Sequence, residues 1–229
     1  MSLSFFSPNR TVLLIADEAL YVYSTGSKGV RLLEAVPWDT ENFEANVAGI
    51  IVKDGGNKPV LVLNDMVEQH YRKEKVIKRG VGLLDKQTMV RRKLNVAFPN
   101  YPVRAALPLK EKSSSSGGGS ADVYIFSAIP DTAQFRQTMA ASKVSLASIA
   151  GFCLLPIESS DMVRALSVKL AKGKRSKSKW TIFIGQHQNG GLRQIVTKNG
   201  ELALTRMTPV KGDDTNIESW ANEVHQEFK

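Results

Sequence analysis

The stretch 186–191, Gln-His-Gln-Asn-Gly-Gly, combines residue types that can bind a phosphate group. It lies between two apolar, β-rich runs, 180–185 and 192–198, and is therefore expected to form an open turn between two strands. Glycines let a backbone approach phosphate oxygens closely, and successive N–H groups in such a turn form a concave site for an anion. The candidate nucleotide-binding residues of this turn are Gly185, Gln186, Gly190 and Gly191.

A second turn signal follows directly along the chain. The pair Asn199 and Gly200 separates the run 192–198 from the alternating run 201–207. Asn-Gly is strongly favoured in type I′ hairpin turns, because both central residues of such a turn need a positive φ. The sequence therefore predicts a three-stranded antiparallel meander over this part of the chain.

Residues that serve metal or nucleophilic chemistry are few and scattered. His70, His187 and His225 are far apart, and none has a second ligand at the spacing of a metal site, so no metal is expected. Cys153 is the single cysteine and lies in the apolar run 149–155, which favours a buried structural thiol in a reducing, cytoplasmic protein. Neither a Walker-type loop nor a Gly-x-Ser-x-Gly motif is present. The sequence thus offers no candidate catalytic residue.

The formal net charge of the chain is +9, and the positive charge is concentrated in two stretches. Residues 72–93 hold nine Lys or Arg against two acids, and residues 169–179 hold six and no acid. Such runs form solvated faces, or they face an acidic protein partner or the anionic inner leaflet of a membrane. Nucleic acid is disfavoured as a partner, because no aromatic residues interleave with the charges to stack on bases. The candidate partner-binding residues are Arg72, Lys73, Lys172, Lys174, Arg175 and, in the meander, Arg206.

The remaining elements follow from apolar periodicity and turn residues. A first meander is expected over residues 11–36, followed by a helix and a buried strand over 60–63, which should pair in parallel after that crossover. The later expected elements are a polar helix over 65–75, a helix over 85–96, strands over 104–109 and 122–129, a helix over 131–142, a strand over 146–155, a helix over 159–172, and a last amphipathic helix over 215–228.

Two meander-and-helix units give the chain a duplicated plan. The expected fold class is α/β with two lobes, each built on a mixed sheet. The first lobe is predicted to cover residues 1–112 and to contain a basic insert at about 65–100. Residues 113–120, Ser-Ser-Ser-Ser-Gly-Gly-Gly-Ser, are expected to form a flexible loop, and residues 121–229 the second lobe.

This plan resembles the actin-like nucleotide-binding folds, which are related to ribonuclease H. Within that class the chain resembles the cytoplasmic actin-like proteins of type IV pilus assembly and type II secretion, the PilM and GspL-like group. The residues that carry the resemblance are Ile184 and Gly185, Ile195 and Val196, 199–202, 204–206, and the segment 144–156 before them. The resemblance implies a further strand and helix beyond the last helix. A chain ending at Lys229 is therefore expected to be a fragment of a longer protein or a reduced fold with an incomplete second lobe.

The resemblance also implies two phosphate loops, and both depart from the pattern of nucleotide-hydrolysing members. The first loop contains Asp17 as its acid, but Glu18, Ala19 and Leu20 follow it without a glycine. In the second loop an acid is expected two residues before Gly185, but this position is occupied by Phe183. A phenylalanine cannot position a metal ion or a water molecule. The chain is therefore expected to be non-enzymatic and to need no cofactor. ATP binding without turnover and active ATP hydrolysis are the alternatives.

The resulting hypothesis is a cytoplasmic scaffold at the inner face of the bacterial inner membrane. It would connect the inner-membrane platform proteins of a pilus or secretion system to the cytoplasmic motor ATPase. The contact surfaces would be the cleft between the lobes, the basic insert and the basic loop over residues 169–179. The alternative is an actin-like ATP-binding protein or ATPase, and a less favoured one is a basic nucleic-acid-binding module.

Overall fold

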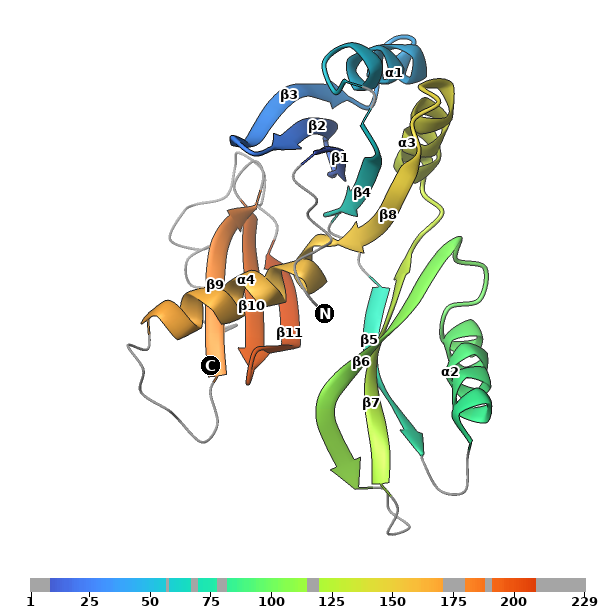
Figure 1. Ribbon diagram of the computed structural model, residues 1–229, viewed down its shortest axis with the longest axis vertical. Helices are drawn as coiled ribbons and strands as arrows, with labels where there is room; N and C mark the ends of the chain where they lie inside the picture. The colour runs from blue at the N-terminus through green and yellow to red at the C-terminus, as the bar shows by residue number, and fades with distance from the viewer. Residues whose placement is uncertain are drawn as a thin grey trace, which may run out of the picture. The chain divides into compact units, whose positions relative to one another are not determined.

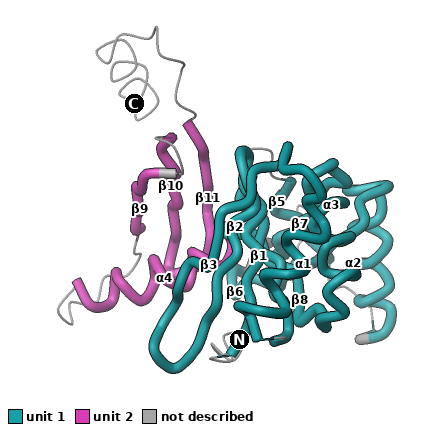
Figure 2. The backbone as a smooth tube through the Cα atoms, turned by 90° about the horizontal axis from the view of Figure 1, so that it is seen from above, with its two compact units in different colours: residues 1–155 teal, residues 156–229 magenta. Residues whose placement is uncertain are grey.

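Figure 1 shows an α/β chain, a computed structural model that describes residues 9–56, 58–66, 70–77, 82–114, 120–170, 180–187 and 191–208. The chain divides into two compact units, Met1–Leu155 and Pro156–Lys229, which Figure 2 colours separately. In chain order the elements are β1 (Arg10–Ile15), β2 (Ala19–Gly26), β3 (Gly29–Pro37), α1 (Phe43–Lys53), β4 (Val60–Asn64), β5 (His70–Ile77), α2 (Leu83–Ala97), β6 (Val103–Ser114), β7 (Ser120–Ile129), α3 (Ala133–Val144), β8 (Ile149–Leu154), α4 (Leu155–Leu170), β9 (Trp180–His187), β10 (Gly191–Lys198) and β11 (Glu201–Thr208).

The first unit contains a five-stranded sheet in the order β3-β2-β1-β4-β8. The predicted first meander is confirmed, since β2 pairs antiparallel with both β1 and β3. The predicted parallel partner is also confirmed, because β1 pairs in parallel with β4. Strand β1 is apolar almost throughout and lies in the middle of this sheet, where its Leu13 and Ile15 are fully buried. Helices α1 and α3 lie against each other and precede the parallel strands β4 and β8.

A second sheet, in the order β5-β7-β6, is inserted in the chain between β4 and α3. Its central strand β7 pairs antiparallel with both neighbours. Helix α2 lies along one face of this sheet (Figure 1). On that face Val76, Tyr124 and Phe126 pack against Met89 and Leu94. The expected basic insert is therefore larger than residues 65–100, because it continues through β7.

The predicted polar helix over residues 65–75 is wrong, because β5 begins at His70. The charged residues of this stretch suit an edge strand, since β5 pairs with β7 on one side only. Its side chains alternate between the face that packs on α2, which receives Val76, and the opposite face, which receives Lys75. The helix expected over 85–96 and the strands expected over 104–109 and 122–129 are confirmed by α2, β6 and β7.

The second unit contains a three-stranded sheet, β11-β10-β9, and helix α4, which crosses one side of it (Figure 1). The predicted meander is confirmed, since both strand pairs are antiparallel. Asn199 and Gly200 have φ angles of 56° and 80°, as a type I′ turn requires. The predicted helix over 215–228 lies outside the described residues.

The compact units divide after Leu155, not at residues 113–120 as the sequence suggested. The Ser/Gly stretch connects β6 to β7, two paired strands of one sheet, and residues 115–119 lie outside the described part of the chain. Helix α3 and strand β8 were expected in the second lobe. They belong to the first unit because β8 pairs in parallel with β4.

Candidate functional site

The carboxyl ends of β1 and β4 meet at one edge of the five-stranded sheet, because the two strands are parallel. The turn 16–18 follows β1, and Asp65 and Met66 follow β4. The backbone N–H of Asp65 donates to the carbonyl oxygen of Ile15 at 2.8 Å, which ties the two segments together. In open α/β sheets ligands bind outside the carboxyl ends of the strands. This edge is therefore the candidate ligand site of the first unit.

Asp17 lies in a short turn whose backbone is fixed at both ends. The N–H of Ala16 donates to the carbonyl oxygen of Ala19 at 3.2 Å, and Trp38 Nε1 donates to the carbonyl oxygen of Ala16 at 3.0 Å. The Trp38 and Phe43 rings lie 5.3 Å apart, centroid to centroid, which holds the indole in place. Asp17 is half-buried, and its turn contains no glycine, so a phosphate there would meet side chains as well as backbone.

Two polar residues at the end of β4 are buried, and the sequence analysis did not select them. Asn64 is 1% exposed and Asp65 is 4% exposed. Asn64 Oδ1 accepts a hydrogen bond from the N–H of Met66 at 3.0 Å, so the Asn64 side chain shapes the chain after the strand. The available signal was that polar residues directly follow the apolar run 60–63. Asp17 and Asp65 are thus acids that follow two adjacent parallel strands.

The described residues contain no group of three or more His, Cys, Asp or Glu side chains that could hold a metal ion. Magnesium is commonly held through one or two carboxylates, with water and phosphate oxygens as the remaining ligands. A magnesium ion bound through Asp17 or Asp65 would therefore need a phosphate-bearing ligand to complete its coordination.

The predicted glycine turn of the second unit is shorter than expected. Gln186 is paired with Leu192, and Gly191 is paired with His187, so both candidates belong to strands, whereas Gly190 lies outside the described residues. Gly185 is also in a strand, beneath an aromatic ring. A Cβ added there would lie 2.8 Å from Cε1 of the Phe183 ring.

The ring of Phe183 therefore occupies the space that the missing side chain of Gly185 leaves open. An aromatic ring that covers a strand glycine in this way supports the strand. It also covers the backbone that a phosphate would have to approach. The structure thus gives Gly185 a packing role that needs no nucleotide.

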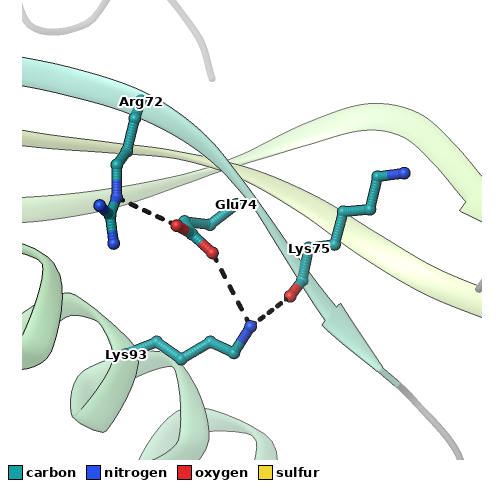
Figure 3. A network of polar contacts seen from close by, with 4 residues as sticks. All are labelled: Arg72, Glu74, Lys75 and Lys93. Carbon is teal, nitrogen blue, oxygen red and sulfur yellow. Dashed lines mark hydrogen bonds and ion pairs between the residues drawn. The ribbon is translucent and has the colours of Figure 1, made fainter.

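The candidate partner residue Arg72 is held inside the polar network drawn in Figure 3. Arg72 Nε lies 3.0 Å from Glu74 Oε1, and Lys93 Nζ of α2 lies 3.8 Å from Glu74 Oε2. Lys93 Nζ also donates to the carbonyl oxygen of Lys75 at 2.7 Å. The guanidinium carbon of Arg72 lies 5.9 Å from the centre of the Phe98 ring. This network fastens α2 to β5, so these cations stabilise the insert.

Lys73, the next candidate, is paired on the opposite face of the sheet. Its Nζ lies 2.9 Å from Glu111 Oε2 of β6. Lys86 of α2 forms an ion pair with Asp122 of β7, and the hydrogen bond to Asp122, followed by one to Tyr124, raises the pKa of Lys86. The acids of the insert are therefore largely engaged with its cations. The exposed residues of α2 include Arg91 and Arg92, which lie on its outward face.

The last group of candidates is only partly described. Lys172, Lys174 and Arg175 lie outside the described residues. Arg206 is exposed on β11, in register with Gln194 of β10, so the structure places it on the sheet of the second unit. Within the described part of the chain, no helix combines the length and the apolar character that a membrane span requires.

Comparison with known proteins gives structural matches only. No protein-family model and no curated protein matches this chain. Its fold matches the solved PilM–PilN type IV pilus biogenesis complex at a TM-score of 0.58 and 13% identity, over 96% of this chain and 70% of that one. The expected α/β actin-like fold, and the likeness to the PilM group, are confirmed at the level of the fold.

Two further structures match at lower similarity. One is a Bacteroides thetaiotaomicron protein with an actin-like ATPase fold, at a TM-score of 0.44 and 10% identity, covering 100% of this chain and 81% of that one. The other is the cytoplasmic domain of EpsL, an inner-membrane component of the type II secretion system of Vibrio cholerae. It matches at a TM-score of 0.42 and 10% identity, covering 87% of this chain and 70% of that one.

Proposed function

We propose that this protein is a non-enzymatic cytoplasmic scaffold of a type IV pilus or type II secretion assembly. It would connect inner-membrane platform proteins with the cytoplasmic motor ATPase. The observation that carries the proposal is the fold match over nearly the whole chain to PilM, which was solved in complex with PilN. A protein with this fold can therefore act by holding another protein.

The geometry of the two expected phosphate loops supports a role without nucleotide turnover. Gly185 lies under the ring of Phe183, and the turn that carries Asp17 has no glycine. Neither segment offers the bare backbone with an adjacent acid that phosphoryl transfer uses. We therefore propose that the protein needs no cofactor for its function.

The outward face of α2 is the proposed contact surface for a partner at the inner face of the membrane. Arg91 and Arg92 are exposed there, whereas Arg72 and Lys73 are engaged in ion pairs. Exposed arginines attract acidic protein surfaces and anionic lipid headgroups alike. The proposal therefore assigns partner binding to Arg91 and Arg92, and not to Arg72 and Lys73 as the sequence suggested.

The test is in-cell cross-linking of an amino-terminally tagged chain, followed by purification and identification of the captured proteins. The proposal expects a pilus or secretion platform protein and the motor ATPase, with several-fold lower recovery for the double variant Arg91→Glu, Arg92→Glu. The matched control is Lys28→Glu, Arg31→Glu, which reverses two exposed charges elsewhere in the first unit. Equal recovery with both variants would contradict the assigned surface, and capture of neither partner class would contradict the scaffold.

An ATP-binding protein is the second candidate, and the edge formed by Asp17 and Asp65 favours it. Thermal unfolding with and without millimolar Mg-ATP separates the two. Ligand at 100 times its dissociation constant stabilises by about 2.7 kcal/mol, which raises the midpoint by several degrees in a chain of this size. The ATP-binding candidate expects that rise to be lost in Asp17→Asn and kept in Glu18→Gln. The scaffold without nucleotide expects no rise at all.

A further inference from the structure

One end of the five-stranded sheet brings together the last turns of two helices and the starts of two strands. Strands β4 and β8 begin side by side, since Val60 is paired with Ile149 and the N–H of Val60 donates to the carbonyl oxygen of Ser148 at 2.8 Å. Helices α1 and α3, which lie against each other in Figure 1, end just before these two strands. The described segments of this end form the helix-end surface, which consists of residues 52–56, 58–60 and 143–149.

The helix-end surface exposes several aliphatic side chains. Leu146 is 89% exposed, Val144 is 58% exposed and Val52 is 49% exposed. Ile149, at the start of β8, is 38% exposed. These side chains come from α1, from α3, from the connection after α3 and from β8, so the surface is made by the fold and not by one amphipathic helix. A group of exposed apolar side chains marks a contact surface for a protein or a membrane.

The backbone of Leu146 is unusual for its residue type. Its φ is 59°, and the other described non-glycine residues with a positive φ are Asn42, Asn100 and Asn199. This conformation costs leucine more energy than asparagine. Leu146 follows Ser145, the C-cap residue of α3, at a position where glycine or asparagine is usual. Backbone strain kept at an almost fully exposed leucine indicates that this side chain serves a contact.

The charges of the helix-end surface are mostly positive. Its cations are Lys53, Lys58 and Lys143, and its acid is Asp54. Lys53 and Lys143 are exposed, and neither forms an ion pair with another described residue, unlike the paired lysines of the insert. Both lie in the last turn of a helix, where a cation offsets the helix dipole. The dipole accounts for the lysines but not for the apolar side chains exposed beside them.

The opposite end of the same sheet has the reverse charge. Around the carboxyl ends of β1 and β4, residues 16–18, 38–44 and 64–65 hold six acids and no Lys or Arg. The hydrogen bond from Trp38 Nε1 to the carbonyl oxygen of Ala16 ties the second of these segments to the first. A body with one acidic and one basic end turns the basic end toward an anionic surface.

The composition of the helix-end surface favours a lipid surface over a protein partner. The cores of protein interfaces are enriched in aromatic residues, Met and Arg and are depleted in Lys. The helix-end surface has no aromatic residue, Met or Arg, and it has three lysines beside Val, Leu and Ile side chains. At a bilayer, lysine stems lie along apolar surface while their ammonium groups reach the headgroups. Aliphatic side chains enter the boundary between headgroups and acyl chains.

We propose that the helix-end surface binds the surface of an anionic lipid bilayer. Leu146 and Val144 enter the headgroup region, and Lys53 and Lys143 contact the phosphate groups of the lipids. This inference rests on the proposed function, which places the protein at the inner face of the membrane. It also gives the first unit two separate surfaces, since the helix-end surface faces lipid and the outward face of α2 is left for an acidic partner protein.

The test is sedimentation of the purified full chain with vesicles of phosphatidylcholine alone, or of phosphatidylcholine with about one-third phosphatidylglycerol. The proposal expects binding to the anionic vesicles only, and weaker binding as salt is added. Leu146→Asn should lower the bound fraction several-fold, and asparagine suits the left-handed backbone, so unfolding would not explain the loss. The matched control is Leu84→Asn, which removes a leucine that is 80% exposed on α2 and should leave binding unchanged. Equal losses in the two variants, or no binding to anionic vesicles, would overturn the proposal.

Charge reversal gives a second comparison in the same assay. Lys53→Glu with Lys143→Glu should abolish vesicle binding, whereas Arg91→Glu with Arg92→Glu should keep it. Loss of binding in the α2 variant alone would place the lipid on α2 and overturn the proposal. Absent vesicle binding together with lower partner recovery for Leu146→Asn in cells would assign the helix-end surface to an acidic protein instead. Because vesicle binding is measured without partner proteins, failure to capture them in cells would contradict the scaffold alone.

Discussion

The two three-stranded sheets, β5-β7-β6 in the first unit and β11-β10-β9 in the second, share one plan and differ on their outer faces. Each is antiparallel, and each has one helix along one side. Opposite α2, the first sheet carries the ion pair of Lys73 with Glu111 on its edge strands, beside Val123 and Ile125 of the central strand, which are each 3% exposed. Opposite α4, the second sheet exposes Trp180 and Ile182. The outer face of the first sheet thus has an ion pair at its edges and buried apolar residues at its centre, whereas the second sheet leaves large apolar side chains exposed.

The inner faces differ as well. Helix α2 is fastened to its sheet by an aromatic cluster and by ion pairs such as that of Lys86 with Asp122. Helix α4 lies against a turn, where Arg164 contacts Gly200. The first sheet thus has charged anchors on both faces. The second sheet depends on apolar burial and on the backbone geometry of the turn at Gly200. Substitutions can remove each kind of support separately.

The largest expected effect is the loss of the aromatic cluster under α2. Phe126 is fully buried at its centre, so Phe126→Ala should lower the free energy of unfolding by about 3–5 kcal/mol through lost burial and a cavity. The control on the outer face of the same sheet is Lys73→Ala, which should change the free energy of unfolding by less than about 1 kcal/mol. Urea unfolding measures both, and similar losses would refute the contrast between the two faces.

The contrast also marks how far the sequence predicts this fold. The meanders were predictable because turns depend on local residue types. Asn and Gly are the residues that most readily adopt the positive φ angles of a type I′ turn, and Asn199 and Gly200 have them. The burial of β1 and the exposure of β9 were not predictable from the sequence, since both strands are apolar, β-rich runs. Leu13 is fully buried in a central strand that contacts α3, whereas Ile182 lies on an edge strand and is 57% exposed.

Long-range pairing explains the other misses. β8 was assigned to the second lobe because it follows the Ser/Gly stretch, but it pairs with β4, which is much earlier in the chain. β5 was expected to be a helix because its residues are charged, and only its position at a sheet edge makes them suitable for a strand. In the candidate site, Asp17 was found from its turn, whereas buried Asp65 becomes notable only once β1 and β4 lie side by side.

The next largest effect concerns the contact between α4 and the β10–β11 turn. Gly200 has φ 80°, and an added Cβ would lie 2.3 Å from Arg164 Cδ. Gly200→Ala should therefore lower the free energy of unfolding by about 1–2 kcal/mol, part of it backbone strain and part of it the contact. In an Arg164→Ala background only the strain remains, so the loss should shrink. A double-mutant cycle measures this coupling.

The control for that cycle is Gly29→Ala in the first meander. Gly29 also has a positive φ, 110°, but no atom lies within 4 Å of its missing Cβ. Its substitution should show no coupling to Arg164→Ala. Equal coupling at Gly29 and Gly200 would show that the effect of Arg164 is not a contact with the turn.

A smaller effect separates turn geometry from packing. Asn199 and Leu146 have nearly the same left-handed backbone, with φ 56° and 59°, but this conformation costs leucine more energy than asparagine. Leu146 is 89% exposed, so it gains little from packing. Leu146→Asn should raise the free energy of unfolding by about 1 kcal/mol, and Asn199→Leu should lower it by about as much. If urea unfolding shows no increase in the free energy of unfolding for Leu146→Asn, then packing contacts of Leu146 offset its backbone strain.

The smallest expected effect is the pH dependence of the charged anchor of α2. The hydrogen bond to Asp122 raises the pKa of Lys86. Because the folded-state pKa is the higher one, protonated Lys86 stabilises the folded chain below the unfolded-state pKa of about 10.4. That stabilisation is lost as the pH rises through the folded-state pKa. The pair lies near the surface, so its contribution should be below about 1 kcal/mol.

Urea unfolding of the unmodified chain and of Lys86→Gln, at about pH 8 and about pH 11, tests this sign. The free energies of unfolding should differ at the lower pH and converge at the higher one. The control Arg91→Gln, on the outward face of the same helix, should show no such convergence, because a guanidinium stays protonated throughout. A constant difference for Lys86→Gln would mean that its ion pair does not fasten α2. The two sheets would then depend on the same apolar burial, and only their outer faces would distinguish them.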